Sequence, residues 1–211
     1  VLSRRSMKQS GAQLEAAIRR DLASAIRNEM DKVIFQGTGA NGQPTGLLND
    51  GSATSTAIAA APTFAHMLTE IVEFMKDAAI TAPNEVRALF RPETFAAMET
   101  AINADIQMTE YYRTAFLLAG RNQSGPLPAN VTISANALPA PTGDPAAVPA
   151  VFTTTTGGQP PMFVALWGGV DLVRDVYSLA PSGSVKLTAM VTMDTAAGRY
   201  EQSRILTGLH V

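Results

Sequence analysis

The stretch DKVIFQGTGANGQPTGLL, residues 31–48, joins the end of a long amphipathic pattern to a segment dense in glycine. From Gln13 to Phe35 apolar residues recur at helical spacing, and charged residues take the opposite face. We predict a helix of roughly 35 Å that starts after Ser10 and Gly11 and stops at Gly37. The residues expected to shape the following turn are Gly37, Gly39, Pro44 and Gly46.

This glycine-rich segment does not have the pattern of a phosphate-binding loop. Such a loop ends in Gly-Lys-Ser/Thr and opens a helix, whereas here the glycines follow a helix and residues 37–48 contain no lysine. We therefore predict an ordered turn or a flexible loop, and no nucleotide or other cofactor.

The middle of the chain alternates helices and strands. Residues 53–61 are small and polar and are expected to form a linker, after which Thr63 can cap a second helix that ends before Pro83. Residues 85–90 alternate polar and apolar like a half-buried strand, and Pro92 can open a third helix that turns Phe95, Met98 and Ile102 inward. This pattern predicts an α+β fold.

The second half is expected to be mostly extended. Residues 120–161 read as loops with one short strand at 131–134, and residues 162–167 as a buried strand that ends in a turn or bulge at Gly168 and Gly169. Alternation from Val185 to Asp194 predicts another strand. Residues 200–206 would pair with that strand as a hairpin or complete the sheet, and these last strands could pack beside the first helix.

Composition limits the classes of function. The chain has 211 residues, 46% hydrophobic and only 16% charged, with a formal net charge of -2. The release of counterions would therefore contribute little to the free energy of binding a polyanion. Nucleic-acid binding as the main activity is not indicated. No apolar run approaches the roughly 20 residues that cross a bilayer, so no membrane partner is expected. Cysteine is absent, which excludes disulfides and thiolate chemistry.

Charge is distributed unevenly along the chain. Residues 1–35 carry seven Lys/Arg against four Asp/Glu, and residues 62–110 carry three against eight. These segments are either ordinary solvated helix faces or opposite patches that meet between copies of the chain. On the second hypothesis the candidate subunit contacts are Arg19, Arg20, Arg27, Glu70, Glu73 and Asp77.

Catalytic patterns are scarce. Neither of the two histidines, His66 and His210, belongs to a recognisable constellation, and no nucleophile elbow or zinc-binding motif occurs. Asp171 and Asp175 could serve a metal-dependent hydrolase only if they lay on a helix, because on the expected strand their side chains are far apart. We predict no catalytic residues, no metal and no enzyme activity.

Two blocks of sequence stand out by their order and separation. The first block is Ser3-Arg4-Arg5 followed by the helix that leads into residues 31–39 and 43–48. The second is LWGGVDLVRDVY, residues 166–177, followed by residues 185–194. Together they span nearly the whole chain, and they resemble the tailed-phage major capsid protein family, which has the Hong Kong ninety-seven fold.

The resemblance implies a peripheral domain with a long spine helix and a β-sheet, and an axial domain with a central sheet flanked by helices. On this hypothesis residues 1–55 and 180–211 form the peripheral domain and residues 56–179 the axial domain. Family members carry an N-terminal arm and an extended hairpin ahead of the spine helix, so we expect this sequence to be part of a longer polypeptide.

The implied function is that of a viral capsid subunit. In its full-length form it would assemble with itself into pentamers and hexamers in the bacterial host cytoplasm, become part of the virion and contact packaged double-stranded DNA only by enclosing it. One alternative is the shell of an encapsulin-like compartment, which shares the fold. A secreted adhesion module, suggested by the Thr, Pro and Gly content of residues 120–161, and the metal-dependent hydrolase remain alternatives from other classes.

Overall fold

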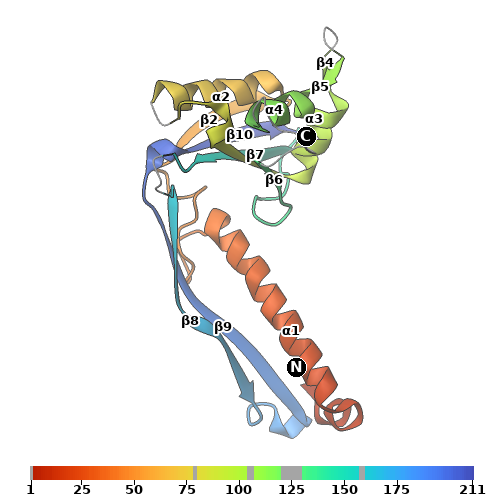
Figure 1. Cartoon of the computed structure of the whole chain (residues 1–211). Coiled ribbons are helices and arrows are strands. Elements are labelled where there is room, and N and C mark those ends of the chain that lie inside the picture. Colours follow the sequence, from red (N-terminus) through yellow and green to blue (C-terminus); the bar gives the residue numbers. More distant parts are fainter. Residues whose placement is uncertain (1, 78–79, 104–106, 120–129, 157–159) are drawn as a thin grey trace.

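The chain folds into two parts, which we call the body and the arm (Figure 1). The structure is a computed structural model that describes residues 2–77, 80–103, 107–119, 130–156 and 160–211. The body is a five-stranded sheet with helices on one face, and the arm is a long helix beside a β-hairpin. The chain therefore has the predicted α+β composition.

Helix α1, Arg4–Gln36, forms one side of the arm. Its 33 residues correspond to about 50 Å. The helix ends before Gly37 as predicted, but it begins well before the expected start at Ser10 and Gly11. A glycine inside a helix costs only about 1 kcal/mol relative to alanine, which is too little to stop a helix of this length.

The hairpin of β8, Met162–Asp175, and β9, Ser184–Ala197, forms the other side of the arm. The two strands pair antiparallel, and the short strand β1, Leu2–Ser3, pairs with the other edge of β9. This order, β1-β9-β8, leaves β8 as an edge strand. Pairing of β1 with Ser184 and Val185 fastens the start of α1 to the far end of the hairpin.

The sheet of the body has the order β2-β10-β7-β3-β6. Pairings β2–β10 and β3–β6 are parallel, and β10–β7 and β7–β3 are antiparallel. The strands are β2 Thr54–Ala60, β3 Val86–Phe90, β6 Val131–Ile133, β7 Ala147–Thr154 and β10 Ser203–His210. The last strand of the chain, β10, thus lies inside this sheet, between β2 and β7.

Three helices cover one face of the sheet: α2 Phe64–Lys76, α3 Pro92–Thr100 and α4 Glu110–Ala119. A two-stranded ribbon, β4 Ile102–Asn103 and β5 Met108–Thr109, connects α3 to α4. The core between helices and sheet includes Met67, Ile71, Phe74, Phe90, Phe152 and Leu206, all fully buried. A smaller apolar cluster of Leu47, Leu138 and Val151 covers part of the opposite sheet face.

Several predictions in the middle of the chain need correction. Residues 53–61 are not a linker, because residues 54–60 form the edge strand β2. Central strand β7 and helix α4 were missed, and Ile102 is 62% exposed rather than inward. The sequence of β2 has no clear apolar alternation, so it was not recognised as a strand. It is extended because it pairs with β10.

The two C-terminal strands belong to different parts of the molecule: β9 lies in the arm and β10 in the body. Strand β9 lies beside α1 as predicted, but β10 pairs with β2 and β7 rather than with β9. Strand β8, expected in the axial domain, instead pairs with β9 in the arm. The division into residues 1–55 with 180–211 and residues 56–179 therefore does not follow the observed sheets. Strand pairing is a long-range property that local periodicity does not encode.

A buried ion pair anchors β10 to α2. The Arg204 guanidinium lies 3.5 Å from the Glu70 carboxylate and 2.5 Å from that of Asp77, and it also stacks over the Phe74 ring. Glu70 is only 1% exposed. Its prediction as a subunit contact is therefore wrong: the helix turns this carboxylate inward because Arg204 neutralises it there.

Candidate assembly surfaces

An exposed apolar stripe runs along the hairpin. Cross-strand neighbours share a sheet face, and the register places Phe163, Trp167, Val173 and Met190 on one face. The exposed carboxylates Asp171 and Asp194 lie on the same face. Their exposed fractions are 51%, 58%, 47% and 53%. We call these four residues the outer stripe. Residues 163–170 are all exposed, so the prediction of a buried strand here is wrong for the single chain.

The opposite face of the hairpin is turned towards α1. The Thr195 hydroxyl donates a hydrogen bond of 2.7 Å to the carbonyl oxygen of Thr45, just beyond the helix. Val191 and Met193 face Met30 of α1 across a cavity of about 200 Å³. Helix α1 covers only part of this side, because Val164 and Leu166 on it remain 43% and 53% exposed. The outer stripe lies on the side away from α1, where a second molecule can reach it.

Strand β8 also presents a long free edge. Its 14 residues contain no proline, and its outer edge has no partner strand within the described residues. The predicted bulge is confirmed: the register shifts between Trp167 and Asp171, and Gly168 has a φ of +77°. A long apolar edge of this kind is a surface on which another chain can pair.

The turn after α1 closes the end of the helix. The amides of Leu47 and Leu48 donate to the carbonyl oxygens of Ile34 and Phe35, each at 3.0 Å. The Asn49 side-chain amide donates to the carbonyl oxygens of both Gln36 and Gly37. The turn therefore satisfies the carbonyl groups that a helix end leaves unpaired.

Close backbone approach explains the glycines of this turn. A Cβ atom at Gly37 would lie 2.2 Å from the carbonyl oxygen of Pro44, and one at Gly46 would lie 2.5 Å from the Gly37 nitrogen. Gly39 has a φ of +70°, which favours glycine. Of the two alternatives for this segment, the structure therefore contains the ordered turn.

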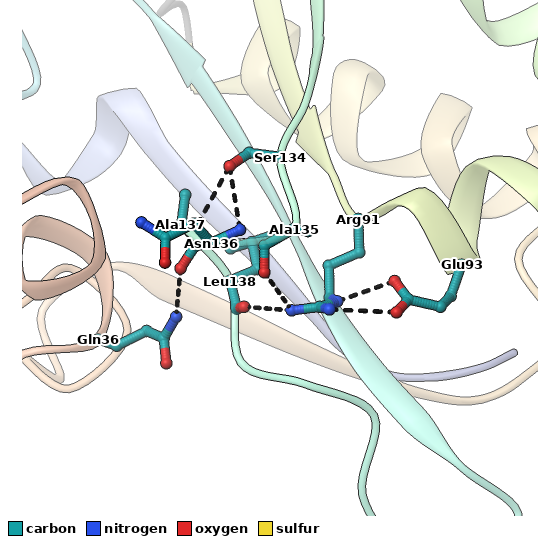
Figure 2. Close-up of polar contacts among 8 residues, drawn as sticks. All are labelled: Gln36, Arg91, Glu93, Ser134, Ala135, Asn136, Ala137 and Leu138. Carbon is teal, nitrogen blue, oxygen red and sulfur yellow. Dashed lines mark hydrogen bonds and ion pairs between the residues drawn. The ribbon is translucent and has the colours of Figure 1, made fainter. Parts of the chain in front are cut away.

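A loop of the body, residues 134–138, lies against the end of α1, and we call it the bracing loop (Figure 2). Arg91 holds it from the body side, donating from Nη1 to the carbonyl oxygens of Ala135 at 2.7 Å and Leu138 at 2.6 Å. Both remaining guanidinium positions bind the Glu93 carboxylate, at 2.9 and 3.1 Å. The hydrogen bond from Arg91 lowers the pKa of Glu93 below its ordinary value of 4.5.

Two amide side chains hold the bracing loop from the side of α1. Gln36 Nε2 donates to the carbonyl oxygen of Asn136 at 2.9 Å. Asn136 Nδ2 in turn donates to the carbonyl oxygen of Asn28, two turns back along the helix. The loop is therefore bonded to both parts of the molecule.

The carboxylates considered for metal chemistry lie apart. Asp171 and Asp175 both lie on β8, four residues from one another, which corresponds to about 13 Å along a strand. Asp175 accepts hydrogen bonds from the Ser178 hydroxyl and from the amides of Ser178 and Tyr177, and these bonds lower its pKa to about 2. Asp175 thus shapes the tip of the hairpin.

Neither histidine stands in a catalytic arrangement. His66 Nδ1 lies 3.1 Å from the Thr63 hydroxyl at the start of α2, and His210 pairs with Ala147 at the end of β10. Among the described residues, no group of three or more His, Cys, Asp or Glu side chains could hold a metal ion. In the same part of the chain, no helix is both long and apolar enough to span a membrane.

The other candidate contact residues lie on two surfaces. Arg19, Arg20 and Arg27 are exposed on α1. Glu73 binds Lys76 at the surface of α2 at 2.5 Å, and Asp77 is bound by Arg204. The exposed stripe on the hairpin was missed, because a continuous apolar run predicts burial without saying whether the burying surface belongs to the same chain.

Solved structures similar to this chain include capsids and an encapsulin complex. The capsid of a native GTA particle aligns with a TM-score of 0.68 and 17% identity over 99% of this chain and 70% of that one. The capsid of Myoviridae phage XM1 gives 0.63 and 12% over 98% and 70%. The holo-encapsulin complex from Synechococcus elongatus gives 0.51 and 13% over 99% and 71%. The fold is therefore the Hong Kong ninety-seven-like fold of shell proteins.

Sequence comparison identifies the family. A sequence model described as the phage capsid family matches residues 1–108, which include α1, the glycine-rich turn, α2 and α3. A comparison with curated proteins gives no match. The chain belongs to the phage capsid family and is a structural subunit of a capsid shell, built from many copies of itself. The resemblance noted in the sequence is thereby confirmed.

Proposed function

We propose that this subunit assembles into pentamers and hexamers that enclose double-stranded DNA, and that the outer stripe and the free edge of β8 form a main contact between copies. The observation that carries this proposal is the exposure of Phe163, Trp167, Val173 and Met190 on one face of the arm. A second copy of the chain is the partner, because a shell consists of repeated copies and a contact surface is used at every repeat.

The energetics suit a shell. Full burial of one large apolar side chain contributes about 1.5–3 kcal/mol, and these side chains are about half exposed in the single chain. Each contact would therefore be weak after the entropic cost of association, while many contacts in a closed shell act together. Weak single contacts also allow misplaced subunits to dissociate.

The two parts of the molecule have separate roles in this proposal. The body, with its sheet and three helices, acts as the axial domain around the centre of each ring. The arm, with α1, β8 and β9, acts as the peripheral domain between rings. This division replaces the one expected from the sequence and follows the observed strand pairing.

The proposed role is structural, without enzyme activity, and assembly takes place in the cytoplasm of a bacterial host. An encapsulin-like compartment is the second candidate, because the fold is also similar to that of an encapsulin complex. The two functions differ in content: a phage shell contains DNA, and a compartment contains protein cargo. Nuclease-resistant DNA in purified particles would favour the phage shell.

Substitution of the outer stripe tests the assembly contact. We expect Trp167→Glu to abolish shells and rings of the expressed protein in negative-stain electron microscopy and to leave small species in sedimentation velocity. Because Trp167 is 58% exposed, the free energy of unfolding should change by only about 0.5 kcal/mol.

The matched control is Ala96→Glu, which places the same charge at an exposed position on α3 in the body. We expect this variant to assemble like the unmodified protein. Normal shells from Trp167→Glu would contradict the role of the outer stripe. Loss of shells from both variants would show that assembly responds to added charge rather than to this surface.

A further inference from the structure

The arm and the body are joined by few elements. The chain crosses between them at residues 37–53, between the end of β7 and the start of β8, and at residues 198–202. Beyond these crossings, two side-chain amide bonds of the described residues join α1 to the body: Gln36 donates to the bracing loop, and Asn136 of the loop donates back to the helix. The orientation of a 33-residue helix therefore depends on bonds at one end.

The bracing loop itself is fixed to the body. The Ser134 amide donates to the carbonyl oxygen of Phe90 at 2.9 Å, and the Ser134 hydroxyl accepts from the amides of Asn136 and Ala137 (Figure 2). The bonds from Arg91, which is 7% exposed, add two further attachments. Because the loop is fixed to the sheet in this way, a group that binds the loop is also held in a defined position relative to the sheet.

Cavities lie on both sides of the last turns of α1. One of about 330 Å³ lies between Asp31 and Phe35 on the helix and Arg87 and Thr132 on the sheet. The cavity of about 200 Å³ already described lies on the hairpin side. Close-packed interiors resist tilting of their elements, whereas a helix end flanked by unfilled volume can tilt without overlap. At this end of α1, Val33 is buried and Phe35 packs against Leu138 and Val151 of the body. The directional bonds therefore act together with this limited packing to fix the angle.

We propose that the bracing loop is a positioning joint: Gln36 and Asn136 hold the arm at one angle to the body, and loss of their two donors releases the arm as a unit. The arm stays intact because β1 pairs with β9 at its far end and Thr195 binds the carbonyl of Thr45 at its near end. If the proposed assembly is correct, this angle influences how strongly the shell curves.

The absence of cysteine allows a direct measurement of this angle. Ala25→Cys on α1 and Ala96→Cys on α3 replace exposed alanines, and nitroxide labels at both report the distance between arm and body by double electron–electron resonance. Dilution into unlabelled protein restricts the signal to pairs within one chain. The measurement does not require assembly, so its outcome is independent of the proposed function.

The test variant combines Gln36→Glu and Asn136→Asp. Both changes preserve side-chain size and replace the donating amide with an acceptor that faces a carbonyl oxygen. We expect the distance distribution to become about twofold broader or to shift, because repelling groups cannot hold the joint. An unchanged narrow distribution in the folded variant would overturn the proposal.

Two further variants keep the test specific. Asn130→Asp is the matched control, because Asn130 Nδ2 donates to the carbonyl oxygens of Asn84 and Leu118, both within the body. It should leave the distance distribution narrow. Gln36→Lys retains a donor and should also keep the distance distribution narrow. This single variant keeps the proposal testable if the double variant does not fold. A broad distribution from Gln36→Lys would contradict a role for the hydrogen bond itself.

Discussion

At the scale of single residues, this chain uses glycine and buried charge to fix positions that apolar packing leaves open. Gly37 and Gly46 permit the backbone after α1 to pass within van der Waals distance of itself. Arg204 reaches from the last strand to two carboxylates, Glu70 on α2 and Asp77 directly after it. Each of these residues constrains segments that are apart in the sequence, and each therefore has a measurable effect on folding.

We expect Gly37→Ala to lower the free energy of unfolding by about 3 kcal/mol, because its Cβ would overlap the Pro44 carbonyl and backbone atoms must move. Urea denaturation followed by circular dichroism measures this change. Gly169→Ala is the control, since no atom lies within 4 Å of a Cβ there. Equal denaturation midpoints for the two variants would contradict this explanation of the turn.

Removal of one partner from the buried ion pair should also be costly. Arg204→Met leaves the Glu70 carboxylate buried without its cation, and we expect a loss of about 3–5 kcal/mol in the same denaturation experiment. Arg204→Met with Glu70→Gln should recover part of this loss. By comparison, Glu73→Gln affects a pair at the surface and should cost less than about 1 kcal/mol. A small effect of Arg204→Met would show that water reaches the pair.

At the scale of elements, the hairpin and the central sheet differ in protection. Strands β7 and β10 each lie between two neighbours and beneath the helical layer. Strand β8 has one neighbour and an exposed outer face. Local opening is easier where few buried apolar contacts must be broken, so the hairpin is the less stable element of the two.

Hydrogen–deuterium exchange measured by mass spectrometry should show this difference. In unassembled subunits, peptides from residues 162–175 are expected to exchange faster than those from residues 147–154. After assembly, protection of residues 162–175 should rise, because the outer stripe and the edge of β8 become covered. Unchanged exchange of the hairpin in shells would place the contact elsewhere, and residues 147–154 serve as the internal reference.

At the scale of the whole molecule, many acidic groups of the segment 62–110 are used internally. Glu70 and Asp77 bind Arg204, Glu93 binds Arg91, and Glu110 binds Arg113. These pairs reduce the acidic charge that the segment offers to a neighbour, although Asp77 and Glu99 remain exposed. The apolar outer stripe is the stronger basis for association between copies, and Arg19, Arg20 and Arg27 stay proposed contacts without an assigned acidic group on a neighbouring copy.

Assembly should consequently depend weakly on salt. Between about 0.05 and about 0.5 M sodium chloride we expect the rate of shell formation, followed by light scattering, to change by less than about threefold, because screening acts mainly on exposed charges. A much larger decrease with salt would support the alternative that opposite charge patches meet. Arg20→Glu with Arg27→Glu would then identify whether the basic face of α1 is one of them.

Patterns in the sequence were sufficient to predict several local elements and the family of this protein. Helical spacing before Gly37, the glycines after it, and the alternation from Val185 are short-range patterns, and the matching helix end, turn and strand follow from them. The same residues carry the resemblance to the phage capsid family, so the fold class could be predicted without coordinates. Subunit contacts among charged residues were predicted less well, because the sequence does not show which charged side chains are buried. On α2, Glu70 is buried whereas Glu73 lies at the surface.

Which strands are neighbours and which surfaces remain open could be seen only in the folded chain. Strand β10 enters the sheet of the body while β9 stays in the arm, although only a few residues separate them. The apolar run of β8 is exposed for the same reason: its partner surface is not supplied by the described part of this chain. Burial and pairing are set by contacts between residues distant in sequence, and such contacts leave no periodic signal in any one segment.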